Sequence, residues 1–380
     1  MKIILISGAR PNYMKIAPIV WAIRRFNRRS APPIQSLLIH TGQHYDPQLF
    51  DVFFRELDLP VPDYCLDVGS GSHTQQTARV MERIEPILQK ERPDLVVVVG
   101  DVNSTVAAAL TAAKLQIPLA HVEAGLRSFD RTMPEEINRM VTDALSDYLF
   151  VTEESGKENL LREGVDAKKI FFVGNVMIDS LQQSRHLWEC STAHEKLGLR
   201  RGEYGVVTLH RPSNVDEGET LQMLMKALAD VAQRLPIIFP VHPRTRKRLE
   251  SLNGSLPGLR FDFERVTGRG LYCLDPLGYL DFMSLVSGAR IVLTDSGGIQ
   301  EETTFLNIPC LTLRNNTERP VTVMQGTNRV IGTSPATIVK EAGRILKCPP
   351  PALAAPPLWD GQAAERIVAV LLEHIPGGSS

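Results

Sequence analysis

Residues 291–302 have the sequence Ile291-Val292-Leu293-Thr294-Asp295-Ser296-Gly297-Gly298-Ile299-Gln300-Glu301-Glu302, and this stretch decides the fold. The β-branched run predicts a strand, Ser-Gly-Gly predicts a tight turn, and the following residues favour a helix. At such a turn, free backbone N–H groups meet the positive end of a helix dipole, and glycines allow a ligand close to the backbone. The stretch therefore indicates a phosphate or diphosphate site, with an ordinary strand-to-helix turn as the alternative.

The same strand, turn and helix pattern repeats along the chain. Apolar strands are expected at residues 2–6, 36–39, 95–99, 119–122, 148–151 and 170–173, and again at 206–209, 237–241, 271–274, 291–293 and 310–313. Strands this rich in Val and Ile are typical of buried parallel sheets. A chain of 380 residues also exceeds the usual size of a single core. We therefore expect an α/β protein with two Rossmann-like domains, residues 1–175 and 176–360, and a last helix within 361–380.

Composition disfavours several classes of function. Lys and Arg total 42 against 43 Asp and Glu, so a net charge of -1 provides no global field for nucleic acid or an anionic membrane. The N-terminal strand is too short for a secretory signal and no apolar run is long enough to span a bilayer, which favours a cytoplasmic protein. Five scattered cysteines form no zinc spacing, so we expect reduced thiols and no metal site.

Two glycine-containing stretches resemble nucleotide motifs but depart from them. Gly69-Ser70-Gly71 lacks the third glycine of a dinucleotide fingerprint, and Gly156-Lys157 is followed by Glu158 where a P-loop has Ser or Thr. NAD binding and a P-loop are therefore disfavoured, and no cofactor is expected. Ser72 or Thr74 is instead expected to cap the helix that follows.

Polar residues follow most predicted strands, where ligands of open α/β sheets bind. Arg10 and Lys15 in the first turn and helix suit a phosphate or carboxylate, with a solvated helix face as the alternative. His210 and His242 each follow a strand and suit binding or proton transfer, with a neutral core histidine as the alternative.

Carboxylates follow the strands of the first half. Asp101, Glu123 and either Glu135 or Glu136 are candidates for acid/base chemistry, because clustered acids shift one another's pKa. Asp101 has a helix cap as its alternative role. Glu135 and Glu136 follow Pro134, and acids in a first helical turn also favour the helix dipole.

Together these segments resemble the non-hydrolysing UDP-N-acetylglucosamine 2-epimerases, which have the GT-B fold. The matching segments are Gly8-Ala9-Arg10-Pro11, Gly100-Asp101, residues 121–127, residues 134–139, Gly174-Asn175, His210-Arg211, residues 295–302 and Thr317-Glu318-Arg319-Pro320. The resemblance implies two Rossmann-like domains whose parallel sheets face a central cleft. It also implies that the C-terminal helix packs back on the first domain and that the protein is a homodimer.

The resemblance further implies the reaction and its residues. UDP-GlcNAc and UDP-ManNAc would interconvert by anti elimination of UDP to 2-acetamidoglucal and re-addition, for surface polysaccharide biosynthesis. The matched catalytic positions are Asp101, Glu123, Glu135 and His210. The matched UDP-sugar positions are Arg10, Lys15, Phe282, Ser296, Gly297, Gly298, Glu302 and Arg319, with Phe282 at the uracil and Glu302 at the ribose. The first domain would carry the catalytic acids and the second would bind UDP.

Departures from the family pattern leave alternatives open. The opening motif is Gly-Ala-Arg-Pro-Asn where Gly-Thr-Arg-Pro-Glu is usual, and His210-Arg211 continues Pro212-Ser213-Asn214 where bacterial members have Arg-Glu. The alternatives are a 2-epimerase of another UDP-2-acetamido sugar or uronate, or a GT-B glycosyltransferase. Candidates for a second site or a ligand-contacting loop are Gln43, His44 and His242.

Overall fold

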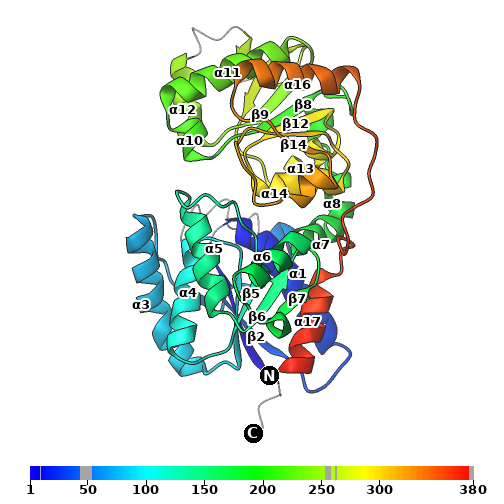
Figure 1. Ribbon diagram of the computed structural model, residues 1–380. Coiled ribbons are helices and arrows are strands. Elements are labelled where there is room, and N and C mark those ends of the chain that lie inside the picture. The colour runs from blue at the N-terminus through cyan, green and yellow to red at the C-terminus, as the bar shows by residue number, and fades with distance from the viewer. Residues whose placement is uncertain (9, 43–53, 253–257, 262, 376–380) are drawn as a thin grey trace. The chain divides into compact units, whose positions relative to one another are not determined.

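The chain forms two compact units in a computed structural model that describes residues 1–8, 10–42, 54–252, 258–261 and 263–375 (Figure 1). The side chains of residues 10, 11, 243, 244, 251 and 252 lie outside this description. Unit 1 contains Met1–Gln183 and the C-terminal segment from Pro357, and unit 2 contains Ser184–Pro356. The expected division at residues 175 and 361 lies near these borders, and its assignment of separate roles to the two domains stays a prediction.

Unit 1 alternates strands and helices. Its elements are β1 (Lys2–Ser7), α1 (Arg10–Asn27), β2 (Gln35–His40), β3 (Tyr64–Cys65), α3 (His73–Glu91), β4 (Leu95–Val99), α4 (Asn103–Lys114), β5 (Leu119–Ala124), α5 (Pro134–Leu145), β6 (Tyr148–Val151), α6 (Glu154–Arg162), a 3-10 turn (Ala167–Lys169), β7 (Ile170–Phe172), α7 (Val176–Gln183) and α17 (Ala363–His374). Within the described residues the strands form one parallel sheet in the order β3-β2-β1-β4-β5-β6-β7. The parallel sheet expected from the apolar runs is confirmed.

Helices cover both faces of the first sheet because its strands are apolar on both sides. In Figure 1, α3, α4 and α5 lie on one side and α1, α7 and α17 on the other. Val80 and Ile84 of α3 pack with Ile4 and Val96 of the sheet in a buried cluster. Ser72 caps α3, since its Oγ accepts the Gln75 N–H at 3.2 Å, as one of the two expected caps predicts.

The C-terminal helix α17 is fastened to unit 1 by a buried carboxylate. Asp179 of α7 accepts the backbone N–H groups of Ala363 and Ala364 at 3.1 and 2.7 Å. These N–H groups belong to the first turn of α17, where a helix has no internal partners for them. Burial, which outweighs these bonds, raises the pKa of Asp179 to about 6. Ile367 and Leu371 of α17 are also buried.

Unit 2 repeats the architecture. Its elements are α8 (Arg185–Glu189), α9 (Ala193–Lys196), β8 (Gly205–Thr208), α10 (Pro212–Val215), α11 (Gly218–Ala232), β9 (Pro236–Pro240), α12 (Pro243–Leu252), β10 (Leu259–Arg260), β11 (Gly270–Leu274), α13 (Tyr279–Ser287), β12 (Ile291–Thr294), α14 (Gly297–Phe305), β13 (Cys310–Thr312), α15 (Val321–Met324), β14 (Asn328–Val330) and α16 (Pro335–Lys347). The parallel order among described strands is β10-β11-β9-β8-β12-β13-β14.

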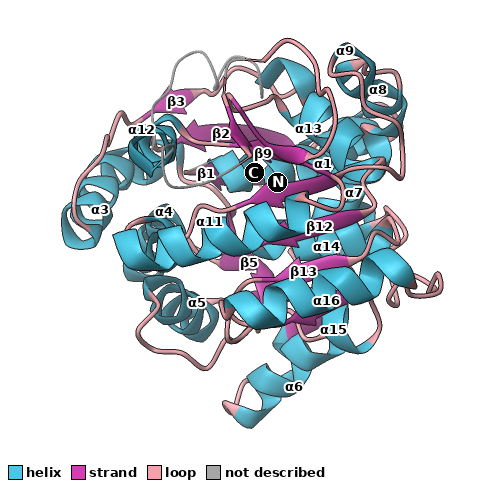
Figure 2. Ribbon diagram, turned by 90° about the horizontal axis from the view of Figure 1, so that it is seen from above, coloured by secondary structure: helices cyan, strands magenta, loops and turns pink. Residues whose placement is uncertain are grey.

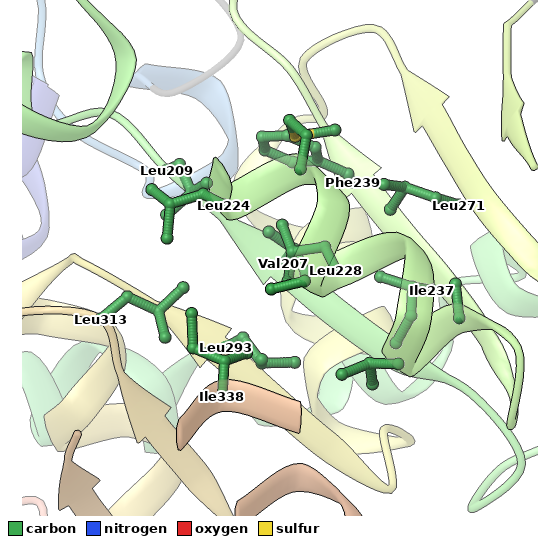
Figure 3. Packing of buried hydrophobic residues seen from close by; sticks show 14 of the residues in the cluster. Val207, Leu209, Leu224, Leu228, Ile237, Phe239, Leu271, Leu293, Leu313 and Ile338 are labelled. Atoms are coloured by element: carbon green, nitrogen blue, oxygen red, sulfur yellow. The ribbon is translucent and has the colours of Figure 1, made fainter. Parts of the chain in front are cut away.

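An apolar core lies under two helices of unit 2. Helices α11 and α16 lie side by side across the strands of this sheet (Figure 2). Figure 3 shows Leu224 and Leu228 of α11 and Ile338 of α16 packed with Val207 and Leu293 of the sheet, all fully buried. The strand predicted at residues 291–293 is thus a central strand, and the helix predicted after Ser-Gly-Gly is α14.

The described helices include none that is long and apolar enough to cross a membrane.

Replacing Gly125 by Ala is expected to destabilise the protein strongly. Gly125 has φ +78°, where a Cβ costs about 1–2 kcal/mol. Its added Cβ would also overlap the carbonyl oxygen of Gly156, and overpacking adds about 1–3 kcal/mol. The matched control is Gly164→Ala, because Gly164 has φ +85° but nothing within 4 Å of such a Cβ. Urea unfolding of the full chain should show the larger loss for Gly125→Ala, and equal losses would contradict this steric account.

Candidate active site

The strand order of unit 1 reverses between β1 and β4, and the carboxyl ends of strands at such a point are where open α/β sheets bind ligands. The turn after β1 is fastened there by Asn12, whose Oδ1 accepts the Gly8 N–H at 3.3 Å. The Nδ2 of the same side chain donates to the Val99 carbonyl at the end of β4 at 2.9 Å. The first turn of α1 is therefore held against the end of β4.

Lys15 and Glu123 form a buried ion pair at this edge. Their side chains are 7% and 2% exposed, and the ammonium of Lys15 donates to Oε2 of Glu123. Gly100 makes room for the pair, since a Cβ there would lie 2.7 Å from Lys15 Nζ and 3.3 Å from Glu123 Oε2. The solvated-face alternative for Lys15 is wrong, because the side chain is buried and paired.

Glu123 lies inside β5 rather than after it, which corrects the strand end expected at residue 122. Its φ is +76°, and the register between β5 and β6 shifts between Val122 and Ala124. A non-glycine residue in this conformation costs roughly 1–3 kcal/mol, and such strain clusters at functional sites. The bulge directs the Glu123 carboxylate toward Lys15, where strict alternation would have directed a neighbour.

Asp101 follows β4 and is held by α5. Its Oδ2 accepts a hydrogen bond from Arg139 Nη1 at 2.5 Å, and Asn138 Nδ2 donates to its carbonyl at 2.8 Å. Val102, not Asp101, occupies the N-cap of α4, so the capping alternative is wrong. Asp101 is instead a carboxylate with a fixed position and a cationic neighbour.

Glu135 and Glu136 are adjacent in the chain but differ in burial and in hydrogen bonding. Glu136 is buried, accepts the backbone N–H groups of Ser128 and Phe129 at 2.9 Å each, and pairs with Arg139. Burial opposes ionisation, but these hydrogen bonds hold the pKa of Glu136 below its usual value. Glu135 is half-buried and has no hydrogen-bond or ion-pair partner within the described ranges. Glu136 is thus structural, which leaves Glu135 as the candidate for proton transfer.

The strand order of unit 2 reverses between β8 and β12, and His210 and Asp295 follow those two strands. His210 Nδ1 lies 2.9 Å from Asp295 Oδ1, and the His210 side chain is 60% exposed. Donation from Nδ1 to the carboxylate leaves Nε2 for a ligand, as in other paired histidines. This placement excludes the core-histidine alternative for His210.

The carboxylate of Asp295 also organises the turn after β8. It accepts the backbone N–H groups of His210 and Arg211 at 3.1 and 3.0 Å and Nδ2 of Asn214 at 3.0 Å. Burial opposes ionisation, yet the hydrogen bond and charge of His210 hold the pKa of Asp295 below its usual value. Asp295 therefore fixes both the backbone and the ring of His210.

The N-terminus of α14 carries a buried arginine and two acids. Arg319 Nη1 donates to Glu318 Oε1 at 2.5 Å, and its Nε lies 2.9 Å from Glu301 Oε1. Burial opposes ionisation, but Arg319 and Arg314 hold the pKa of Glu318 well below its usual value. A Cβ on Gly297 would overlap Arg319 and lie 2.7 Å from Glu318. Gly297 therefore admits this ion pair, a contact that the sequence did not indicate.

The remaining predicted positions of unit 2 lie on α14, on α13 and after β9. Ser296 is the N-cap of α14, and Gly298 is half-buried in its first turn. Glu302 is 2% exposed, and its Oε1 accepts the Tyr279 hydroxyl at 3.2 Å. Phe282 is half-buried on α13, and His242 is exposed after β9.

Three other predicted positions receive no side-chain description. Arg10 begins α1, but its side chain is outside the description, and Gln43 and His44 lie outside the described residues.

Arg139 and His121 are the residues that sequence reasoning missed. Both lie in quoted motifs, at residues 134–139 and 121–127, but neither follows a strand. For His121 the available signal was a titratable side chain within a short, largely apolar strand, which predicts a buried partner. The helix that carries Arg139 contains several other polar residues, so its sequence offers no comparable signal.

Comparison with known proteins identifies relatives along the whole chain. A family model for UDP-N-acetylglucosamine 2-epimerase matches residues 27–372. The UDP-N-acetylglucosamine 2-epimerase of Methanocaldococcus jannaschii is 43% identical over 376 residues, 98% of this chain and 99% of that protein. A UDP-2,3-diacetamido-2,3-dideoxy-D-glucuronate 2-epimerase of Pseudomonas aeruginosa is 40% identical over 346 residues, 90% of this chain and 91% of that protein.

The fold of this chain is also similar to a solved structure. The crystal structure of the Methanocaldococcus jannaschii UDP-GlcNAc 2-epimerase, in complex with UDP-GlcNAc and UDP, has a TM-score of 0.87 at 42% identity. The match covers 98% of this chain and 100% of that one.

Replacing Asp295 by Asn is expected to lower the free energy of unfolding by about 2–4 kcal/mol, because a buried ionised acceptor of several N–H groups is lost. Its lowered pKa means that this stabilisation is present at neutral pH and is lost as pH falls below about 4. Asp230→Asn is the control, since Asp230 is exposed and has no hydrogen bond within the described ranges. Urea titrations at pH 7 should separate the two variants, and their difference should shrink toward pH 3. Equal stability of the variants at pH 7 would contradict the role of Asp295.

Proposed function

The chain belongs to the UDP-N-acetylglucosamine 2-epimerase family, and we propose that it interconverts UDP-GlcNAc and UDP-ManNAc. In the forward direction the C1–O bond breaks, UDP departs with the electron pair, and the C2 proton passes to a base. The resulting 2-acetamidoglucal is then protonated at C2 on the other face, and UDP adds again at C1. The substrate complex of the 42% identical relative is the observation that carries this proposal.

The diphosphate is assigned to unit 2. The departing UDP gains negative charge, which preorganised donors and cations stabilise. The first N–H groups of α14, at Gly297 and Gly298, supply such donors, and the buried Arg319 adds a cation beside Gly297. The N–H of the N-cap Ser296 already donates to Thr294 Oγ1 at 3.0 Å, so the expected contact of Ser296 is assigned to its hydroxyl. The exposed ring of His210, which Asp295 orients, is assigned as a further hydrogen-bond donor to the diphosphate.

The other UDP contacts follow the family resemblance. Glu302, buried beside Tyr279, is assigned to the ribose hydroxyls, and Phe282 is assigned to the uracil ring. Arg10 and Lys15 are assigned to the phosphates. An ammonium has three donors, so the pairing of Lys15 with Glu123 leaves capacity for such a contact.

The proton transfers are assigned to the carboxylates of unit 1. Asp101 has Arg139 as its cationic neighbour and Glu123 has Lys15, and a carboxylate with such a neighbour suits a base or a partner for positive charge at C1. Glu135 is half-buried with no partner among described residues, which suits a group that gains and loses a proton.

We also propose a homodimer in the cytoplasm. The family resemblance supports the dimer, and the odd number of cysteines, which fits poorly with a disulfide framework, supports the location. Light scattering on the purified chain would measure the assembly.

Incubation with UDP-GlcNAc in D2O is expected to place deuterium at C2 of the recovered sugar nucleotide. Glu135→Gln should lower the exchange rate by roughly 10²–10⁴-fold, as loss of a general acid or base does, at unchanged UDP affinity. Glu82→Gln on α3, also an acid with no partner in the described part of the chain, is the control and should exchange normally.

Other outcomes of this assay would redirect the proposal. Exchange only with a UDP-2,3-diacetamido uronate would assign the substrate class of the Pseudomonas relative. Sugar transfer to an acceptor without C2 exchange would indicate a glycosyltransferase. A folded, UDP-binding protein with no exchange on any UDP-2-acetamido sugar would refute the epimerase assignment.

Replacing Gly297 by Ala is expected to weaken UDP binding about 10-fold, or about 1.4 kcal/mol, because the added Cβ would displace Arg319 from its position beside the start of α14. Gly218→Ala is the matched control, because Gly218 also begins a helix of unit 2 and has nothing within 4 Å of an added Cβ. Titration calorimetry with UDP measures both. Equal affinities for the two variants would show that the Arg319 position does not matter for UDP.

A further inference from the structure

His121 lies on β5 inside unit 1, fully buried. Its Nδ1 lies 2.6 Å from Asp143 Oδ1, and its Nε2 lies 2.9 Å from the carbonyl oxygen of Gly100. A carboxylate and a carbonyl are both acceptors. The ring therefore satisfies both neighbours only when each ring nitrogen carries a proton and donates.

We propose that His121 is a positioning residue that acts through the Gly100 carbonyl to orient Asp101 for the proposed epimerisation. Gly100 immediately precedes Asp101, so the bonded carbonyl belongs to the peptide group that carries the Asp101 N–H. A hydrogen bond to that carbonyl fixes the plane of this peptide. The expected effect on turnover rests on the proposed function. The expected effect on the position of the peptide before Asp101 does not.

The surrounding charges balance a doubly protonated ring. Asp143 Oδ2 lies 2.7 Å from Arg127 Nη1, and Arg127 also pairs with Glu163 at 2.6 Å. The cluster thus contains two cationic and two anionic side chains. Burial opposes ionisation of Asp143, but the charges of His121 and Arg127 hold its pKa below the usual value, so Asp143 remains the acceptor that this arrangement requires.

The turn that carries Asp101 depends on this hydrogen bond. Gly100 has φ +66° and donates its N–H to the Val122 carbonyl at 3.0 Å. On the other side of Asp101, Asn138 holds its carbonyl at 2.8 Å and Arg139 its carboxylate at 2.5 Å. Loss of the His121 contact would free the peptide before Asp101 while those two contacts remain. A shifted carboxylate should then lower turnover more than binding.

Two substitutions separate the two ring nitrogens. His121→Gln places an amide N–H near the position of Nε2 and retains a donor for Gly100. His121→Asn places it near Nδ1 and retains a donor for Asp143 only. Both variants remove the ring and its charge, and each keeps one of the two contacts, so the direction of the difference between them shows whether the Gly100 or the Asp143 contact matters more for turnover.

The expected result is a split between kcat and KM. His121→Asn should lower kcat for C2 exchange about 10- to 100-fold, the usual consequence of a lost buried hydrogen bond, with KM and UDP affinity within about threefold. His121→Gln should keep kcat within about threefold of the parent protein. Thermal unfolding of both variants controls for simple loss of structure.

A second measurement does not depend on activity. In protein with 15N-labelled Asp, the Asp101 amide resonance should shift in His121→Asn and stay near its parent position in His121→Gln. Histidine labelled at its ring nitrogens should show both nitrogens of His121 protonated in the parent protein. If the parent shows no exchange, the proposed function fails, and these spectra still decide the positioning role.

Equal kcat values for the two variants would overturn the inference, as would an Asp101 amide that shifts equally in both. If His121→Asn does not fold, the kcat and UDP affinity of His121→Gln test the inference by themselves. Retained kcat supports the role of the Gly100 contact, and a tenfold loss at unchanged UDP affinity overturns it.

Discussion

A buried carboxylate and its side-chain partner at the carboxyl edge of each sheet fix the turns that carry the candidate chemistry. Parallel pairing brings the ends of all strands to one edge, and apolar strands leave the charged side chains of the turns partly or wholly buried there. Lys15 with Glu123 serves unit 1, and His210 with Asp295 serves unit 2. Removing one partner would leave an uncompensated charge, which is far more costly than removing a surface pair.

These pairs also explain why the site tolerates unfavourable backbone. Glu123 has a positive φ and Gly100 has to lack a side chain, and both conditions serve the same contact with Lys15. Gly297 plays the corresponding part in unit 2, where it admits Arg319 and Glu318 beside the start of α14. In unit 1 the free energy lost in the backbone conformation of Glu123 is offset by a charge placed at the edge of the sheet.

Further buried side chains support Asp101 and the turn that carries it. Arg139 connects Asp101 to Glu136, and Glu136 in turn accepts the N–H groups of Ser128 and Phe129. His121 connects the Asp143 carboxylate to the Gly100 carbonyl. Such supporting contacts restrict the positions that the candidate carboxylates can take, as an enzyme that depends on orientation requires.

Local pattern determined the elements, and only the tertiary structure decided the partners. Val and Ile runs such as residues 95–99 and 291–293 predicted their strands, and Ser-Gly-Gly predicted the start of α14, because both signals lie within a few residues. Sequence could not separate Glu135 from Glu136, nor pair Asp101 with Arg139, because these contacts join residues far apart in the chain or depend on helix phase. The role of Gly297 likewise appeared only with Arg319 in place, since a turn glycine looks the same whether it admits a ligand or a side chain.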